Sequence, residues 1–540
     1  MTQTKNVKAG PTKGPGKDVR PRGYHIMSEM PVWKALLKMA TPAIIFMLIV
    51  GAYMFTDMIL AVNLVSGYDS GIHVLGAKNT IRLTLGAFGP INPFLNAVAM
   101  LFGMGIATRV SINMGAKRHD RAKNTLKTGM MVGMSVALIM VPILMFSMKP
   151  WMMTQVTSDI APQIADRAFG YGAIIVGMFP LSMFNQILSS MFRTEGRNKA
   201  IMTPYVMSIA LNLFFDWIFM GPAKMGIIGG ALATLLSTLF VTIFFIIIIL
   251  KQKKSIITFK NMFGIHFKII SIVGILLVGL SPFLRNFASS ITGSFEASTI
   301  KDISHHIYSG PIGDKHMTLM LSGGFPVFLL FFPMIFSFAQ AGRPIASFNF
   351  GAKDMKRVKE VYLWVAIYAT ITALAIYLVS AYAMSGVLLD WLGVSDYSTI
   401  SIKDPNNSGH MINKVIKTMQ KTDTIKMLKI MMLSIVIFGL VIASMVLLGS
   451  TDRIWLAVFV SLLRGVILFF PFLYAFQALA IANTSNEFLF WWFYPSIALT
   501  SAILATATSM FVLYHLKKKV KTLDERLDTF YSKFNNRKAK

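Results

Sequence analysis

The feature that most constrains this chain is a series of apolar runs, each long enough to cross a bilayer. A transmembrane helix needs about 20 predominantly apolar residues. Hydrophobic residues make up 55% of the chain and charged residues 14%, a balance unlike that of a water-soluble domain. We therefore predict an all-α integral membrane protein. About twelve runs are long enough, near residues 39–62, 86–110, 128–148, 166–191, 203–220, 227–250, 268–290, 318–345, 361–386, 428–449, 455–480 and 488–515.

The net charge and the absence of cysteine exclude other classes. A formal charge of +29 would indicate a nucleic-acid partner in a soluble protein. Here the basic residues lie between the apolar runs, so we predict no such partner. Without cysteine, disulfides, iron–sulfur clusters and thiolate zinc sites are excluded. The sequence also lacks a phosphate-binding loop and protease motifs, and we predict a protein that is not an enzyme and has no cofactor.

Basic residues also orient the chain, because loops kept in the cytoplasm carry an excess of Lys and Arg. Their distribution predicts that both termini are cytoplasmic, with disordered basic tails at residues 1–33 and 517–540. This topology places the segment near 387–427 outside, although it holds several lysines. We interpret it as an extracellular insertion. The segment near 63–85 is a second long loop, and we predict a multi-pass protein of the cell membrane.

An internal repeat divides the chain in two. Residues 111–123 (SINMGAKRHDRAK) and 347–359 (SFNFGAKDMKRVK) share seven identities in thirteen positions, at an offset of 236 residues. We call these segments the GAK loops. Both follow an apolar run, and the second lies six runs after the first. Since six is even, both loops lie on the same side of the membrane. The alternative is that they are two unrelated basic loops that both obey the positive-inside rule. The repeat therefore predicts two six-helix lobes, an N-lobe at 34–255 and a C-lobe at 256–516, related as parallel repeats.

Further segments of the sequence carry distinctive motifs in addition to the GAK loops. They are Pro42 with Asp57 fifteen residues later, the loop at 191–200, Asn212 with Asp216, the glycine-rich start of a helix that reaches Thr234, and the stretch 344–351. Together with the GAK loops, these segments resemble the multidrug and toxic compound extrusion (MATE) family of cation-coupled antiporters. The resemblance implies a central cavity that opens alternately to either side of the membrane.

The resemblance also implies a function and partners. Expected substrates are small-molecule drugs or toxic organic cations of lipophilic character, exported against entry of a proton or a sodium ion by a monomer embedded in membrane lipid. Some family members carry an acid in the seventh and tenth helices. The runs near 268–290 and 428–449 contain none, so the resemblance places coupling in the N-lobe. A flippase for lipid-linked saccharides is the alternative, which a strongly basic cavity would favour. An integral membrane enzyme acting on lipid is a more distant one.

Two acids lie deep in apolar helices, where an ionisable group is costly unless it faces a cavity or a partner. Asp57 and Asp216 fall at similar depth, so they can share one cavity. Asn212 and Tyr53 each lie four residues before one of these acids, on the same helix face, and Thr234 reaches a comparable level. Two close carboxylates cannot easily both ionise in a low dielectric. The cluster therefore predicts a proton site, although the same oxygens would suit sodium.

The other candidate residues depend on weaker arguments. Both acids could instead serve only to hold helices together by hydrogen bonds. Asn185 is added to the cavity by family resemblance alone, and Pro42 is expected to bend the first helix. Arg109 and Arg343 lie near predicted cytoplasmic helix ends, where a long side chain can reach water. We therefore assign neither arginine to substrate binding.

Overall fold

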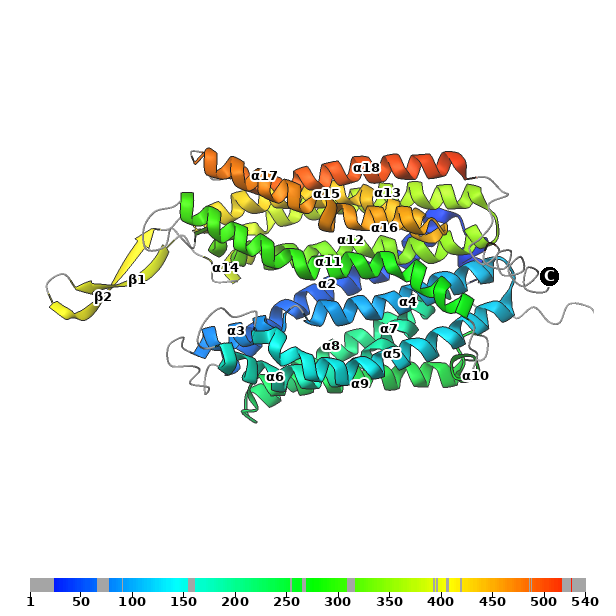
Figure 1. Ribbon diagram of the computed structural model, residues 1–540, viewed down its shortest axis with the longest axis horizontal. Helices are drawn as coiled ribbons and strands as arrows, with labels where there is room; N and C mark the ends of the chain where they lie inside the picture. Colours follow the sequence, from blue (N-terminus) through cyan, green and yellow to red (C-terminus); the bar gives the residue numbers. More distant parts are fainter. Residues whose placement is uncertain are drawn as a thin grey trace, which may run out of the picture.

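The protein is a bundle of long, nearly parallel helices (Figure 1). The computed structural model describes residues 24–65, 77–89, 91–153, 161–252, 255–264, 269–307, 316–391, 394, 397–404, 407–417, 420–484, 486, 488–516 and 526. Within these residues, eleven helices are long and apolar enough to cross a membrane, and a bent pair would make a twelfth span. The predicted all-α membrane fold of about twelve spans is confirmed.

The first half of the chain forms ten helices in the described ranges. Their bounds are α1 Tyr24–Ser28, α2 Val32–Val65, α3 Ala77–Phe88, α4 Ile91–Gly115, α5 His119–Met153, α6 Ala161–Gly177, α7 Phe179–Thr194, α8 Asn198–Met220, α9 Gly226–Lys251 and α10 Phe259–Met262. The predicted fourth span is the pair α6 and α7, bent by 45° at Met178. Pro180, in the first turn of α7, lacks the N–H that would continue the helix.

The second half repeats the pattern of long helices. Its elements are α11 Ile269–Ile307, α12 His316–Gly351, α13 Met355–Leu378, the π-helix η2 Val379–Ala383, α14 Ser385–Trp391, α15 Gln420–Ser450, α16 Ile454–Leu462, the π-helix η3 Leu463–Ile467, α17 Phe469–Ala482, the 3₁₀-helix η4 Leu489–Trp492 and α18 Phe493–His515. The eleventh predicted span is thus α16 and α17 joined through a π-helical turn.

Both long loops contain secondary structure that was not predicted. Helix α3 occupies the end of the first loop. In the second, α14 is followed by an antiparallel hairpin of β1 (Tyr397–Asp404) and β2 (Asn407–Lys417). The hairpin projects beyond the helices at one end of the bundle (Figure 1). We call this the hairpin end, and the opposite end, where α4 and α12 finish, the loop end.

The predicted tail at 1–33 includes an ordered segment. Tyr24–Ser28 form α1, and the Asn349 side chain of α12 donates a 2.9 Å hydrogen bond to the Met27 carbonyl. Arg357 of α13 donates one of 2.9 Å to the carbonyl of Met30. Disorder is therefore wrong for the stretch after residue 23, since it is tied to the second half of the chain. Residues 1–23, and 517–540 except Arg526, lie outside the described residues.

The two GAK loops meet at the loop end. A Cβ placed on Gly115 would lie 1.8 Å from the Phe348 carbonyl oxygen, and one on Gly351 would lie 1.9 Å from that of Ile112. Each contact becomes the other after a shift of 236 residues, as in a twofold-symmetric interface. Only glycine allows this approach. The contacts confirm that both copies of the repeat lie at the same end of the molecule, as parallel repeats require.

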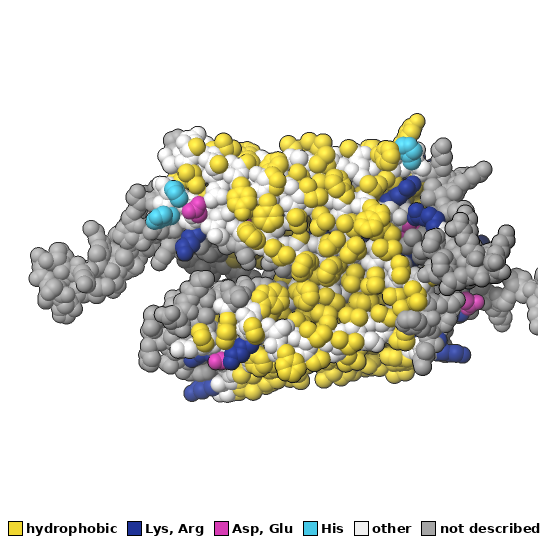
Figure 2. Space-filling model, viewed as in Figure 1, with side chains coloured by type: hydrophobic (Ala, Val, Ile, Leu, Met, Phe, Trp, Pro, Cys, Tyr) yellow, Lys and Arg dark blue, Asp and Glu magenta, His cyan; other side chains and the backbone are white. Residues whose placement is uncertain are grey.

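The outer surface is apolar around its middle. Figure 2 shows hydrophobic side chains over the centre of one face, with charged and His side chains toward its two ends. Large apolar side chains are more than half exposed on several helices, such as Phe146, Ile371 and Phe511. A patch of this extent would drive association in water, whereas in a bilayer it is the lipid-facing surface.

Candidate functional site

Asp216 is a buried carboxylate between two helices of the first half. Its residue is 0% exposed, and its Oδ1 atom lies 3.7 Å from the position that a Cβ on Gly230 would take. Glycine therefore lets α9 approach the carboxylate on α8 closely. Burying an acid in this way is costly unless it has partners or a cavity, so Asp216 stands out as a candidate functional group.

A hydrogen bond ties the same face of α8 to α2. The Tyr53 hydroxyl of α2 donates to Asn212 Oδ1 over 2.5 Å, and Asn212 is 2% exposed. Asn212 lies one helical turn before Asp216, on the same face. We call Asp216, Asn212 and Tyr53 the acidic cluster. Asp57 lies on α2 one turn after Tyr53, and its side chain lies outside the described residues.

Thr234 lies on α9 one turn after Gly230. Its hydroxyl donates a 2.9 Å hydrogen bond to the Gly230 carbonyl oxygen, within its own helix, and its side chain is half-buried. A Thr hydroxyl bonded in this way keeps free lone pairs on its oxygen. The structure thus places Thr234 on the helix that faces Asp216.

Asn185 belongs to a neighbouring cavity. Its amide donates to the Thr238 carbonyl over 3.1 Å and accepts from the Thr242 hydroxyl over 3.1 Å. The cavity measures about 250 Å³ and lies between α4, α7, α8 and α9. Ser208 of α8 also lines it, one turn before Asn212. The cavity and the acidic cluster therefore follow one another along the same face of α8.

Pro42 lies inside α2, which runs without interruption through it. Proline removes one backbone N–H and crowds the carbonyl one turn earlier. The Asn198 side chain of α8 donates to the carbonyl of Met39, in that preceding turn. The expected bend at Pro42 stays a prediction, but the structure shows the proline next to a contact between α2 and α8.

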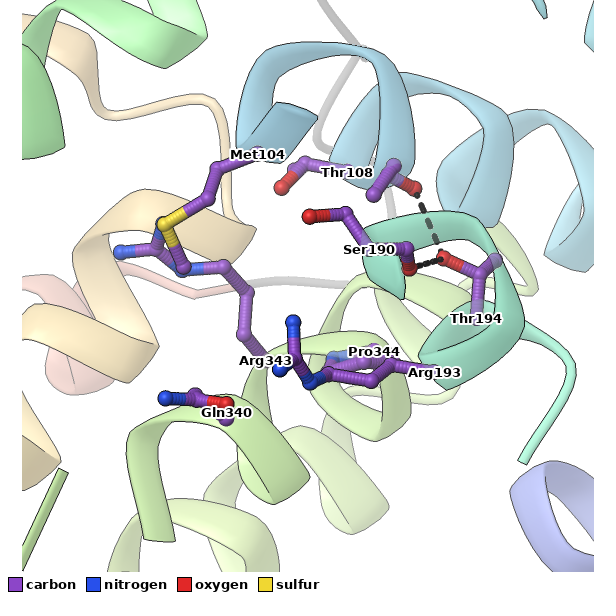
Figure 3. Close-up of a pocket in the computed structure, with 9 residues that line it drawn as sticks. Met104, Thr108, Ser190, Arg193, Thr194, Gln340, Arg343 and Pro344 are labelled. Atoms are coloured by element: carbon purple, nitrogen blue, oxygen red, sulfur yellow. Dashed lines mark hydrogen bonds between the residues drawn. The ribbon is translucent and has the colours of Figure 1, made fainter. Parts of the chain in front are cut away.

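Arginines lie inside the bundle where none was expected. Arg343 is 6% and Arg109 2% exposed, so the prediction that both reach water is wrong. It fails because both helix ends are packed against other helices at the loop end. Arg109 is neutralised by a 2.9 Å ion pair with Asp452. Arg343 instead lines a small pocket between the halves, together with Arg193 (Figure 3).

Two further arginines lie among aromatic rings of the second half. Arg285 of α11 lies 4.7 Å from the ring centroid of Phe336, and Arg464 of η3 lies 4.8 Å from that of Phe438. Both side chains are partly buried. Cation–π contacts of this kind stabilise a cation away from water. The second half therefore holds two arginines among aromatic rings, whereas the buried Asp216 lies in the first half.

Comparison with known proteins identifies the chain. Residues 42–218 match the family model MatE. The chain is 21% identical to the uncharacterised MG447 homolog MYCGA2290 of Mycoplasmoides gallisepticum, over 86% of this chain and 81% of that protein. It is 28% identical to the multidrug export protein MepA of Staphylococcus saprophyticus, over 42% of this chain and 48% of MepA. These matches confirm the predicted resemblance to the MATE family.

A solved structure agrees with this assignment. The fold matches the outward-facing conformation of a multidrug resistance MATE family transporter of the MOP superfamily, with a TM-score of 0.76 and 17% identity. The match covers 92% of this chain and 99% of that chain. The fold is thus that of MATE transporters, and the relatives of the chain include multidrug export proteins.

One acid of this MATE transporter was missed. The seventh span was predicted to end near residue 290 and to hold no acid, but α11 continues to Ile307 and carries Glu296. The Tyr494 hydroxyl of α18 donates to Glu296 Oε1. A signal was present, because Pro282 precedes Glu296 by fourteen residues, close to the spacing of fifteen between Pro42 and Asp57. The polar stretch after residue 287 obscured it.

The acids of the described residues do not form a conventional metal site. No three His, Asp or Glu side chains come together within the part of the chain that the structure describes. The oxygen ligands available around Asp216 are amide, hydroxyl and carboxylate groups, the types of ligand that hard cations prefer.

Proposed function

We propose that this MATE transporter is a secondary active exporter, in which a proton or a sodium ion enters at the acidic cluster and lipophilic compounds, organic cations among them, leave. The observation that carries the proposal is the fully buried Asp216 beside Gly230 and one turn from the Tyr53–Asn212 hydrogen bond. A carboxylate in this environment favours binding of a proton or of a cation that replaces its lost hydration.

The helices that meet at the cluster support a coupling mechanism. Asp216 and Asn212 lie on α8, Gly230 on α9 and Tyr53 on α2. Binding of a cation would draw the polar groups of α2 and α8 together, and its release would let them separate. The cavity at Asn185 opens along the same face of α8. An ion bound at Asp57, Asp216, Asn212 and Thr234 would therefore alter the shape of a neighbouring substrate cavity.

We also propose that the loop end faces the cytoplasm and that the lobes are 34–255 and 256–516. The basic GAK loops support this orientation, and both termini then lie inside. A single cysteine at Lys117, in this cysteine-free chain, should react with an impermeant reagent only from the cytoplasmic side. Labelling from outside would reverse the orientation.

Transport in proteoliposomes tests the function. Purified protein is reconstituted, and movement of a lipophilic cation such as tetraphenylphosphonium is followed with a proton gradient or a sodium gradient imposed separately. We expect one gradient to drive vectorial transport that protein-free vesicles lack. Coupled antiport would be contradicted if the transport rate were the same with a proton gradient, with a sodium gradient and without any gradient. A rate that does not fall when the gradient is dissipated would contradict it as well.

The basic interior favours a second candidate, a flippase for lipid-linked saccharides. Arg193, Arg343, Arg285 and Arg464 could hold the diphosphate of such a lipid. The acidic cluster argues against it, because a flippase has no evident need for a buried carboxylate. Scrambling of a fluorescent polyprenyl diphosphate in vesicles, dependent on the protein and lost on mutation of these arginines, would decide for the flippase.

A further inference from the structure

The pocket between the halves collects polar groups from both. Its polar lining consists of Thr108 of α4, Ser190, Arg193 and Thr194 of α7, and Gln340 and Arg343 of α12. Figure 3 shows the side chains of the first half approaching those of α12 across the space, with the Arg193 side chain extending into it. We call it the arginine pocket. Helices α4 and α7 belong to the first half and α12 belongs to the second. The pocket therefore exists only while the two halves are in contact at this level of the bundle.

The pocket is rich in hydrogen-bond donors that have no acceptor. Thr108, Ser190 and Arg343 are 2%, 4% and 6% exposed. In the described part of the chain, the hydroxyls of Thr108 and Ser190 and the Nε atom of Arg343 have no hydrogen-bond partner. Unsatisfied buried donors are uncommon, because each costs free energy. Three of them around one small space indicate a missing acceptor.

The charges of the pocket are also unbalanced. Within the described residues, the ion pairs include Arg109 with Asp452 and Arg197 with Glu195, but none involves Arg193 or Arg343. In the part of the chain that the structure describes, the Arg343 Nη1 atom donates a hydrogen bond to the sulfur of Met104, at 3.4 Å, and sulfur is a weak acceptor. A buried charge without a counter-charge is costly, so we expect the pocket to bind an anion.

The size of the pocket limits that anion. Its volume is about 30 Å³, whereas a water-sized occupant needs about 10–15 Å³ and a drug-sized ligand about 300–1,000 Å³. We propose that the arginine pocket binds one small inorganic anion of the size of chloride, held by the Arg193 and Arg343 guanidinium groups and by the hydroxyls of Thr108 and Ser190. This site is independent of the coupling ion and of the transported substrate.

The position of the anion gives it a role in the conformational equilibrium. Its ligands come from both halves, and Gly115 and Gly351 pack the same halves together nearer the loop end. Separation of the halves here would split the site and expose two arginines of like charge. A ligand that binds one state better than the other shifts the equilibrium toward that state. Bound anion therefore stabilises the arrangement in which the loop end is closed.

Thermal unfolding of the purified full-length transporter in detergent tests the site. Chloride is titrated against gluconate at constant sodium and ionic strength. We expect a saturable rise in Tm, because a ligand that binds only the folded state stabilises it. Arg343→Gln and Arg193→Gln should each weaken the apparent chloride affinity by about 10- to 100-fold, the effect of losing a charge-assisted hydrogen bond. Arg464→Gln, an interior arginine outside the pocket, should leave the affinity unchanged.

Other outcomes would overturn the proposal. A Tm that does not respond to chloride in the wild type, or that responds equally in the Arg343→Gln and Arg464→Gln variants, would exclude the site. Stabilisation by inorganic phosphate but not by chloride would show that the pocket takes an oxyanion instead. If the arginine variants fail to fold, crystals of the wild-type protein grown in bromide test the site instead. An anomalous peak between Arg193 and Arg343 supports the site, and peaks only elsewhere refute it.

Discussion

The two halves of this transporter share a backbone framework but differ in the charge they bury. Ala107 of the first half and Arg343 of the second are equivalent under the 236-residue shift. Each backbone carbonyl accepts a hydrogen bond from a hydroxyl at the end of a neighbouring helix, from Thr194 over 3.5 Å and from Ser450 over 3.3 Å. The same contact thus recurs, while a methyl group in one half is replaced by a guanidinium group in the other.

The comparison shows which parts of the repeat are free to diverge. Helix contacts made by glycines and carbonyl oxygens, as at Gly115 and Gly351, depend on the backbone and hold in both halves. Side chains that point into the bundle need only be compatible with their own surroundings. The first half could therefore acquire a carboxylate at Asp216, and the second half arginines at 285 and 464, on one scaffold. We expect the two interiors to serve different ligands.

The largest expected effect comes from neutralising the acid of the first half. Asp216→Asn, and likewise Asp57→Asn, should abolish gradient-driven transport while leaving a folded protein, because an amide of similar volume preserves packing but cannot take up a proton. Transport in proteoliposomes and elution as a single species from size exclusion would measure both effects.

A matched acid of the second half serves as the control. Asp390→Asn removes an exposed carboxylate paired with Lys421, and transport should persist. Full gradient-driven export by a variant that combines Asp57→Asn and Asp216→Asn would break the comparison, because coupling would then lie outside the first half, with Glu296 as the next candidate.

The acidic cluster was predictable because its residues lie on regular helices. Residues four positions apart lie on the same face of a helix, so Asn212 and Asp216 share a face whatever the tertiary structure. Asn185 was grouped with them, but its amide is engaged by Thr238 and Thr242 in a separate cavity. The burial of Arg343 was not predictable, since its position near a helix end indicated water, and only the packing of α12 against α4 at Gly351 excludes it.

Breaking the ion pair that joins the halves should have the next largest effect. Asp452→Asn leaves the buried Arg109 without its counter-charge, which we expect to cost about 3–5 kcal/mol of unfolding free energy. Asn tolerates the left-handed backbone that Asp452 adopts, with φ of 54°. The loss of stability should therefore reflect the lost charge and not backbone strain. Thermal or denaturant unfolding in detergent would measure it.

The control is an exposed ion pair within one helix. Asp120 and Lys123 of α5 lie 3.3 Å apart and Asp120 is 95% exposed, so Asp120→Asn should cost no more than about 1 kcal/mol. Equal losses in the two variants would mean that Asp452 does not stabilise the Arg109 charge.

The helix ends illustrate a second limit of sequence reasoning. The apolar run of the seventh span stops near Phe287, and the following stretch of Ser, Thr and Gly was taken to lie outside the helix. It remains helical because it packs on α17 of the same half, where Phe295 contacts Phe470 with ring centroids 5.2 Å apart. The existence of the helix could be predicted from local hydrophobicity. Its length could not, because it depends on packing partners that are distant in sequence.

The glycine contacts test whether the halves are equivalent at the loop end. Gly115→Ala and Gly351→Ala each place a methyl group less than 2 Å from a carbonyl oxygen of the other half. Both should destabilise the protein by about 1–3 kcal/mol, as overpacking does, and by similar amounts. Gly293→Ala, with nothing within 4 Å of the added group, is the matched helical control. A large cost for only one of the two glycines would show that the contact is not symmetric.

The smallest expected effect compares one tyrosine of each half. Tyr53 donates to Asn212 beside Asp216, and Tyr494 donates to Glu296. Replacing either with Phe removes one hydroxyl and retains the ring, at a cost of about 0.5–1.5 kcal/mol for the hydrogen bond. If the coupling ion binds in the first half, Tyr53→Phe should weaken the apparent ion affinity of transport by about 2- to 12-fold. Tyr494→Phe should leave that affinity unchanged while lowering stability by a similar amount. The reverse result, an ion affinity that responds only to Tyr494→Phe, would move the coupling site to Glu296 and assign the acidic cluster to packing.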